Sequence, residues 1–138
     1  MAIIEPERYD EIRAVLDVSF NDQALPDDII EMPIFYDAAE QWVIDSDSEA
    51  LSRTGTALER IERATIYKTA ALIAPAVPNI TSKALGGQVS QSLDIDWDAR
   101  AALLHARADS EIDAVVEASD ETPSMPTMFA VASGTRGW

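Results

Sequence analysis

The chain of 138 residues contains no cysteine. Disulfide bonds, thiolate metal ligands and cysteine nucleophiles are therefore excluded, and nothing in the sequence indicates an oxidising compartment. With 47% apolar residues the chain can enclose one hydrophobic core, but it is too short for two ordinary domains. We expect a single domain that is held together by packing alone, with appended segments outside its core.

Long apolar runs are also missing from the sequence. No stretch approaches the roughly 20 apolar residues that a membrane-spanning helix requires. The N-terminus has neither the basic start nor the apolar stretch of a signal peptide. We therefore expect a soluble protein that is made in the cytoplasm and has no membrane partner.

Positive charge is scarce, because 10 lysines and arginines stand against 25 aspartates and glutamates, for a net charge of −15. Affinity for nucleic acid comes largely from basic side chains that displace counterions from phosphates, so specific binding to DNA or RNA is not expected. The acidic charge has three interpretations. It keeps the protein soluble, it forms a surface that stays near DNA without binding it, or it imitates DNA.

Asp94, Asp96 and Asp98 occupy alternate positions, as the first oxygen ligands of a calcium loop do. Such a loop also needs glycine at its position 6 and glutamate at its position 12, where this chain has Ala99 and His105. Asp96 fits better as a helix N-cap, and Asp98 as an acid in the first helical turn. The sequence therefore predicts no metal site and no cofactor.

The signatures of catalysis are absent as well. His105 is the only histidine, and no serine lies at a spacing typical of a nucleophile. No glycine-rich phosphate loop is present. A pair of carboxylates acting as acid and base stays possible, but acids spread over helix faces are typical of solvated surfaces. We predict that the protein is not an enzyme, and we assign no catalytic residue.

The apolar pattern predicts an all-α protein, a small four-helix bundle over residues 1–118. Helices are expected over 6–17, over 33–45 after a turn at 26–31, from about Thr56 to Ile73, and from Asp96 to about Ala118. Thr56 and Glu59 have the spacing of a capping box. The predicted core residues are Trp42, Ile61, Leu72, Trp97 and Leu104.

Two of these helices have distinctive patterns. The helix that ends at Ile73 becomes apolar on nearly every side before Pro75 and Pro78, as expected of a central buried helix. The last helix has apolar residues at steps of three and four. Its predicted buried stripe consists of Trp97, Ala101, Leu104, Ala108, Ile112 and Val115.

Residues 79–95 have the two-residue period of a β-strand, and Gly86-Gly87 suits a hairpin turn. A lone two-stranded hairpin is only marginally stable in water. We therefore expect this inserted β-hairpin to pack against another subunit. The predicted interface residues are Leu85, Gly86, Gly87 and Val89.

Residues 119–138 are expected to form an extended C-terminal arm, because two prolines and two glycines exclude a long helix. Disordered tails are normally poor in large apolar residues, whereas this segment contains several. We interpret it as an arm that becomes ordered on a partner; the alternative is an arm that folds back on its own bundle. The predicted partner-binding residues are Met125, Met128, Phe129, Val131 and Trp138.

Several segments together resemble a known family in their order and pattern. They are Leu25 to Ile30, the alanine-rich helix from Ala64 to Ala74, the glycine hairpin, and Asp96 to Ala101. Over roughly residues 6–117 the chain resembles the head-to-tail connectors of tailed bacteriophages, also called adaptor or head-completion proteins.

This resemblance implies a structural virion protein in the neck, between capsid and tail. Such proteins are helical bundles that form an oligomeric ring, typically dodecameric, below the portal, and the ring extends the DNA channel. The implied partners are copies of the chain itself, the portal protein above, and a neck, stopper or tail protein below. DNA would pass through without specific binding. The competing interpretation is an acidic DNA mimic or another inhibitory protein-binding module, which would need its charge concentrated on one face.

Overall fold

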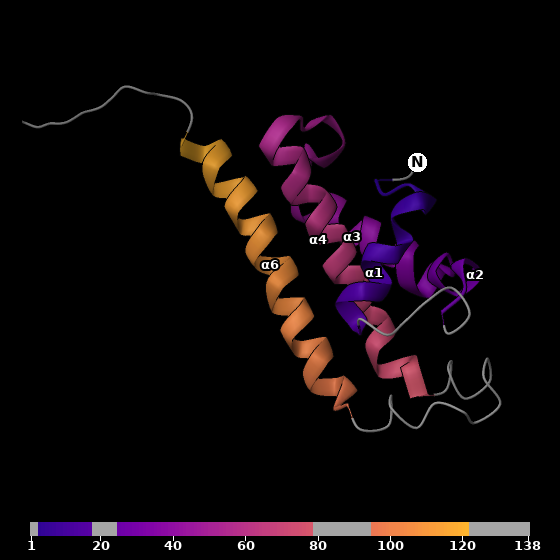
Figure 1. Ribbon diagram of the computed structural model, residues 1–138. Helices are drawn as coiled ribbons and strands as arrows, with labels where there is room; N and C mark the ends of the chain where they lie inside the picture. The colour runs from indigo at the N-terminus through magenta and orange to yellow at the C-terminus, as the bar shows by residue number, and fades with distance from the viewer. Residues whose placement is uncertain (1–2, 18–24, 79–94, 122–138) are drawn as a thin grey trace, which may run out of the picture.

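The computed structural model describes residues 3–17, 25–78 and 95–121, and most of these residues are helical (Figure 1). No strand occurs within these three ranges, so the all-α class is confirmed for the described part of the chain. The hairpin predicted over 79–95 lies outside the described residues, apart from Ile95. The segment 122–138 also lies outside them.

The first predicted helix forms as a 3-10 turn, η1 (Pro6–Arg8), followed by α1 (Tyr9–Leu16). Pro6 stands at the start of η1, where its missing N–H removes no helical hydrogen bond. The turn predicted at 26–31 is a single helical turn, α2 (Asp27–Ile30), because the N–H groups of Ile29 and Ile30 both bond to the carbonyl of Pro26.

Arg13 joins α1 to α2 from a buried position. Its Nε donates to the carbonyl of Leu25 at 2.7 Å, Nη1 donates to Asp10 at 2.9 Å, and Nη2 donates to Asp27. The guanidinium therefore satisfies a backbone carbonyl at the point where the chain enters α2.

The predicted helix over 33–45 begins with a π-helical turn, η2 (Pro33–Asp37), and continues as α3 (Ala38–Ser46). Tyr36, in η2, fixes the N-terminal segment: its hydroxyl accepts the N–H of Ile4 at 2.7 Å and lies 2.7 Å from the Glu40 carboxylate, to which it donates. Burial raises the pKa of the Tyr36 hydroxyl, so it keeps the proton that this bond requires.

A short 3-10 turn, η3 (Ala50–Ser52), leads into α4 (Gly55–Ile73). The N-cap of α4 is Thr54, and it makes no side-chain capping bond. The capping box predicted from Thr56 and Glu59 is therefore wrong, because Thr56 already lies inside the first turn. Gly55 starts the helix at φ +64°, a left-handed conformation that glycine adopts without steric cost.

Helix α4 is the central helix, as predicted, since it contacts α1, α3, η2 and α6. Two threonines lie buried in its second half. Thr65 donates its hydroxyl to the carbonyl of Ile61 at 2.9 Å, and Thr69 donates to Thr65 at 2.7 Å, so both hydroxyls are satisfied within the helix. After Ile73 the chain tightens into η4 (Ala74–Ala76), which contains the expected Pro75.

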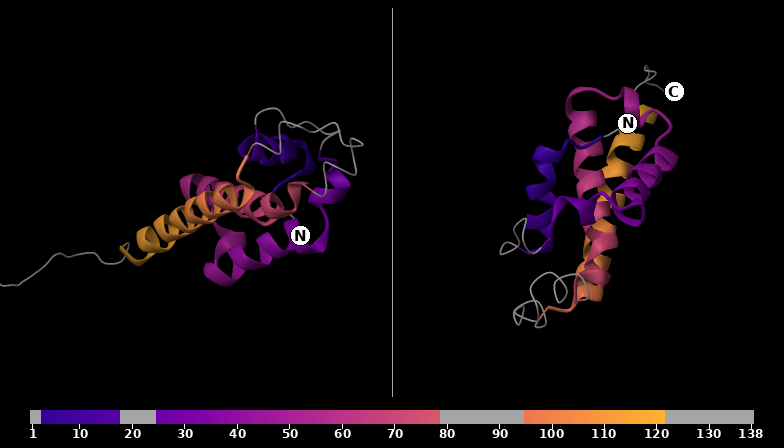
Figure 2. Two further views of the ribbon diagram at one scale, coloured as in Figure 1. Left: turned by 90° about the horizontal axis from the view of Figure 1, so that it is seen from below. Right: turned by 90° about the vertical axis from the view of Figure 1, so that its right-hand side faces the viewer.

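Helix α6 (Trp97–Glu121) lies along α4 in all three views of Figures 1 and 2. Asp96 caps it as predicted, accepting the N–H of Ala99 at 3.0 Å. The helix runs past the predicted end near Ala118, so the first residues assigned to the arm, 119–121, are helical. All members of its predicted stripe are buried: Trp97, Ala101, Leu104, Ala108, Ile112 and Val115.

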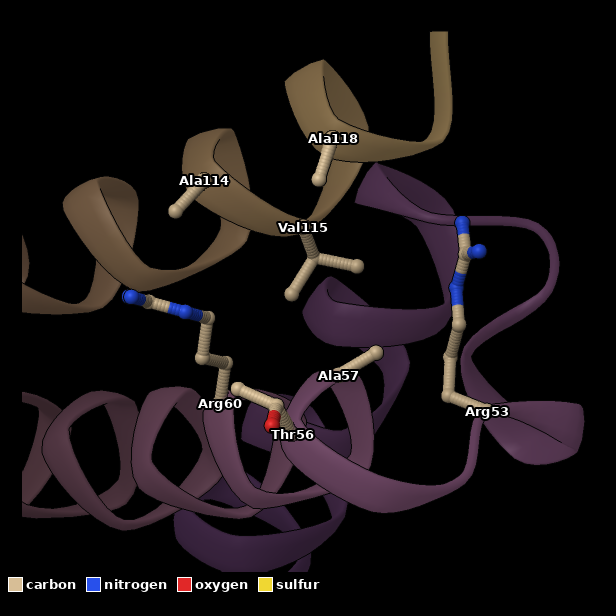
Figure 3. Close-up of a pocket in the computed structure, with 7 residues that line it drawn as sticks. All are labelled: Arg53, Thr56, Ala57, Arg60, Ala114, Val115 and Ala118. Carbon is tan, nitrogen blue, oxygen red and sulfur yellow. The ribbon is translucent and has the colours of Figure 1, made fainter. Parts of the chain in front are cut away.

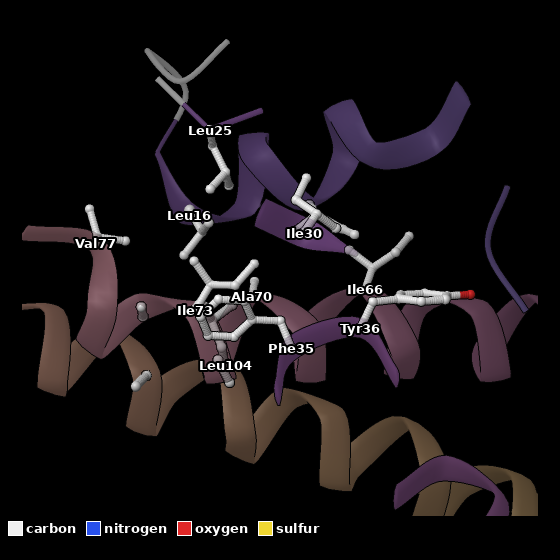
Figure 4. Packing of buried hydrophobic residues seen from close by; sticks show 14 of the residues in the cluster. Leu16, Leu25, Ile30, Phe35, Tyr36, Ile66, Ala70, Ile73, Val77 and Leu104 are labelled. Carbon is white, nitrogen blue, oxygen red and sulfur yellow. The ribbon is translucent and has the colours of Figure 1, made fainter. Parts of the chain in front are cut away.

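The core consists of two clusters that share α4 and α6. The larger one joins α1, α2 and η2 to the second half of α4 and the first half of α6 (Figure 4). The smaller one joins α3 and η3 to the other halves of the two long helices.

The residues predicted as core fall into two groups. Ile61, Trp97 and Leu104 are buried, whereas Trp42 and Leu72 are only half-buried. Leu72 packs against the larger cluster and Trp42 against the smaller one. A tryptophan ring is large enough that it rarely disappears completely into a core.

Candidate interaction surfaces

Most arginines in the described part of the chain form ion pairs with carboxylates. Arg53 makes two bonds of 2.9 Å to Asp47, and these lower the pKa of that carboxyl. Glu111 binds both Arg60 and Arg63 across the contact between α4 and α6. These arginines are therefore paired within the chain, and the acidic excess comes from its 25 aspartates and glutamates against 10 lysines and arginines.

Exposed carboxylates occur on each of the α-helices in the described part of the chain. Helix α6 has exposed carboxylates near both of its ends, at Asp98 and Glu117. Other exposed acids lie on α1, α2, α3 and α4, at Asp10, Glu11, Asp27, Asp28, Asp45 and Glu59. An acidic DNA mimic would need its charge concentrated on one side.

Lys68, His105 and Trp42 meet where α3, α4 and α6 come together. The Lys68 Nζ lies 2.9 Å from His105 Nδ1 and 4.3 Å from the centre of the Trp42 ring. Burial lowers the pKa of His105, and the Lys68 charge lowers it further, although Asp109 opposes the shift. In this geometry a neutral imidazole accepts a hydrogen bond from the Lys68 ammonium group. The cluster therefore connects α3, α4 and α6.

The structure describes most of the residues that the sequence analysis considered for chemistry. Asp96 is used as a cap, Asp98 is exposed and His105 binds Lys68, while Asp94 lies outside the described ranges. Among the residues that the structure describes, no three histidine, aspartate or glutamate side chains come close enough to hold a metal ion.

Four large apolar side chains of the described residues are exposed, on or beside η2, η3 and α6. Met32 and Ile34, with 39% and 63% of their surface exposed, flank Pro33 at the start of η2. Leu51 on η3 and Leu103 on α6 are about half exposed. The sequence analysis did not single out these residues.

A groove opens between the start of α4 and the end of α6 (Figure 3). Its volume is about 510 Å³, and Figure 3 shows Ala57 and Val115 pointing toward one another between Arg60 and Arg53. Its other lining residues are Thr56, Ala114 and Ala118. We call this hollow the α4–α6 groove. A second groove, of about 450 Å³, lies between the N-terminal segment and η3.

The residues predicted to contact partners lie outside the described residues. These are the hairpin residues Leu85, Gly86, Gly87 and Val89, and the arm residues Met125, Met128, Phe129, Val131 and Trp138. Their predicted roles stay predictions.

Comparison of the chain with models of protein families, with curated proteins and with solved structures gives no match. Within the described ranges, no helix combines the length and the apolar character needed to cross a membrane.

Proposed function

We propose that this chain is a head-to-tail adaptor of a tailed bacteriophage, a structural protein of the virion neck that forms a ring below the portal. The observation that carries the proposal is the distribution of charge. Carboxylates are exposed on every α-helix of the described part, while arginines such as Arg53 and Arg63 are held by carboxylates of the same chain. The proposal includes no catalytic activity.

A ring that surrounds a moving DNA duplex benefits from such a surface. Basic side chains would bind phosphates by counterion release and hold the duplex in place. Acidic walls repel the phosphates, so the duplex passes without being retained. Because every α-helix of the described part exposes carboxylates, the channel wall is acidic whichever helix lines it.

Ring closure needs two different surfaces on each subunit, because a head-to-tail contact that closes by rotation joins unlike patches. The candidates for these two patches are exposed apolar residues: Met32 with Ile34 for one, and Leu51 for the other. The inserted β-hairpin over 79–95 would add to the contact between neighbours. In this proposal the C-terminal arm reaches the portal, and a neck, stopper or tail protein binds the opposite side of the ring.

Electron microscopy of particles that contain the chain tests the proposal. The expected result is a ring of many copies between portal and tail. The isolated chain is expected to form few rings, because many small interfaces become stable only on a template that gathers the subunits. A single copy per particle, or copies in no symmetric arrangement, would contradict the proposal.

A variant that lacks residues 122–138 and keeps all the described helices tests the role of the C-terminal arm. Its circular dichroism should match that of the full chain, while its attachment to the portal should be lost.

Binding to DNA separates the proposal from a nucleic-acid-binding role. At ordinary salt we expect no shift of a duplex in a gel, because the basic residues available for counterion release are too few. Tight, salt-sensitive binding would overturn the channel interpretation. Co-purification with a DNA-binding protein whose activity the chain inhibits would instead support the acidic mimic.

A further inference from the structure

The α4–α6 groove has features of a site for an extended apolar segment. Its floor consists of small or apolar side chains, Ala57, Ala114, Val115 and Ala118, and its volume of about 510 Å³ lies in the range of pockets that bury bound groups. Val115 is buried, but Ala57 and Ala114 are half-buried and Ala118 is exposed, so apolar surface is left in contact with water.

The arginines of the groove argue against a small anion as the occupant. Arg53 already makes two bonds to Asp47, and Arg60 binds Glu111. An anionic ligand would have to compete with carboxylates of the same chain. A guanidinium has five N–H donors, however, and Arg60 uses Nη1 for Glu111, so it can also donate to the carbonyl oxygens of an extended chain.

The sequence supplies a segment of matching chemistry next to the groove. Helix α6 ends at Glu121, one turn beyond Ala118, and the chain continues through residues 122–138. This segment contains no aspartate or glutamate in a chain that has 25 of them, and its one charged side chain is Arg136. The exposed carboxylates of Asp113 and Glu117, which neighbour the lining residues Ala114 and Ala118 in the sequence, therefore do not repel the segment.

We propose that, in the free subunit, the α4–α6 groove binds the chain's own residues 125–131, whose apolar side chains are Met125, Met128, Phe129 and Val131. An extended chain spans at most about 3.6 Å per residue, so the residues between Glu121 and Met125 are enough for the chain to turn back along α6. Pro123 in this connection favours a turn. The short tether also holds the segment at an effective concentration of the order of millimolar.

This docking goes beyond the proposed adaptor function, because it describes the subunit before any partner is present. The groove covers the apolar residues of the arm until a partner takes them. A partner that binds the arm must therefore displace it from the groove.

The lack of cysteine in the chain gives a direct test. Ala57→Cys is combined with a cysteine in place of Met125, Met128, Phe129 or Val131, one pair at a time, in the full-length protein. The control pairs place the first cysteine at Glu117, which is exposed in the last turns of α6, within reach of the arm, and does not line the groove. Each protein is oxidised at low concentration, and disulfide formation is followed on non-reducing gels.

At least one Ala57→Cys pair should form an intramolecular disulfide on the order of tenfold faster than its Glu117→Cys control, because the groove holds the two thiols together. Ala118→Phe, which fills the groove from an exposed position, should remove this advantage while circular dichroism shows that the helices are retained. Equal rates at Ala57 and Glu117 would overturn the proposal. Disulfide-linked dimers in place of monomers would also overturn it, because they would assign the groove to the arm of another copy. Neither failure bears on ring formation around the portal, which is tested separately.

Discussion

Lys68 and His105 face each other across the contact between α4 and α6, with Nζ 2.9 Å from Nδ1. The arrangement requires a neutral imidazole, since an imidazolium would present a second cation to the ammonium group. Burial and the charge of Lys68 lower the pKa of His105, which favours the neutral form of the ring. The charged groups that act on the imidazole are Lys68 and Asp109, the latter one helical turn away on α6.

The first prediction concerns pH. Below the ordinary pKa of 6.5 the unfolded chain protonates His105, whereas the folded chain resists protonation, so the free energy of unfolding should fall as the pH drops from 6.5. Above that pH the effect should be absent. Urea denaturation at about pH 7.5 and about pH 5.5 measures the change, and a His105→Gln variant should show a smaller decrease than the native chain. Equal decreases in the two proteins would refute the assignment.

The second prediction concerns Arg13, the buried guanidinium between α1 and α2. Arg13→Ala should lower the free energy of unfolding by about 1–3 kcal/mol, because the carbonyl of Leu25 loses its partner at a buried site. The matched variant is Arg8→Ala, whose ion pairs with Glu11 and Glu62 are partly exposed to solvent, and it should cost less than about 1 kcal/mol. Chemical denaturation of both variants gives the comparison. If the two lose the same stability, the Leu25 contact is not the cause.

The third prediction concerns Trp97 at the start of α6. Its side chain is only 5% exposed and belongs to the larger core cluster, so Trp97→Ala should cost about 3–5 kcal/mol. Leu103→Ala, on the exposed face of the same helix, should change stability by no more than about 0.5 kcal/mol. Thermal melting followed by circular dichroism measures both. An unchanged melting curve for the Trp97 variant would place that side chain at an interface and not in the core.

The fourth prediction concerns Gly55, which starts α4 at φ +64°. A Cβ atom at this position would have open space around it, so a substitution there is disfavoured by backbone conformation alone. Gly55→Ala should cost about 1–2 kcal/mol, and Gly55→Asn should cost less because asparagine adopts left-handed conformations more readily. Denaturation curves of the two variants decide the point. A stabilising Gly55→Ala would mean that the residue leaves the left-handed region in solution.

The parts of the fold that could be predicted from the sequence depend on short-range patterns. The stripe from Trp97 to Val115 and the cap at Asp96 are set by neighbours within one or two helical turns, and both were found. The start of α4 could not be predicted from side-chain spacing, because it depends on the left-handed conformation of Gly55. The contact between Trp42 and Lys68 likewise joins residues that are distant in sequence.

The candidate interaction surfaces were harder to predict from the sequence than the helices. A groove such as the one lined by Ala57 and Ala118 forms only when two helices diverge at one end, and local periodicity contains no information on that divergence. The ion pair between Arg63 and Glu111 likewise joins residues that only the fold brings together. Charge composition alone indicated an acidic protein, but not that the arginines are used internally.

The division of the core into two clusters along α4 and α6 has a consequence for amide hydrogen exchange. The larger cluster packs the first half of α6 against α1, α2, η2 and α4, whereas the second half is held by a smaller set of side chains around Val43, Ile61 and Ile112. Local opening takes place where fewer buried contacts must be broken. Backbone amides near Ile112 should therefore exchange with solvent sooner than those near Leu104, and the far end of α6 should separate from α4 while the rest of the bundle stays closed.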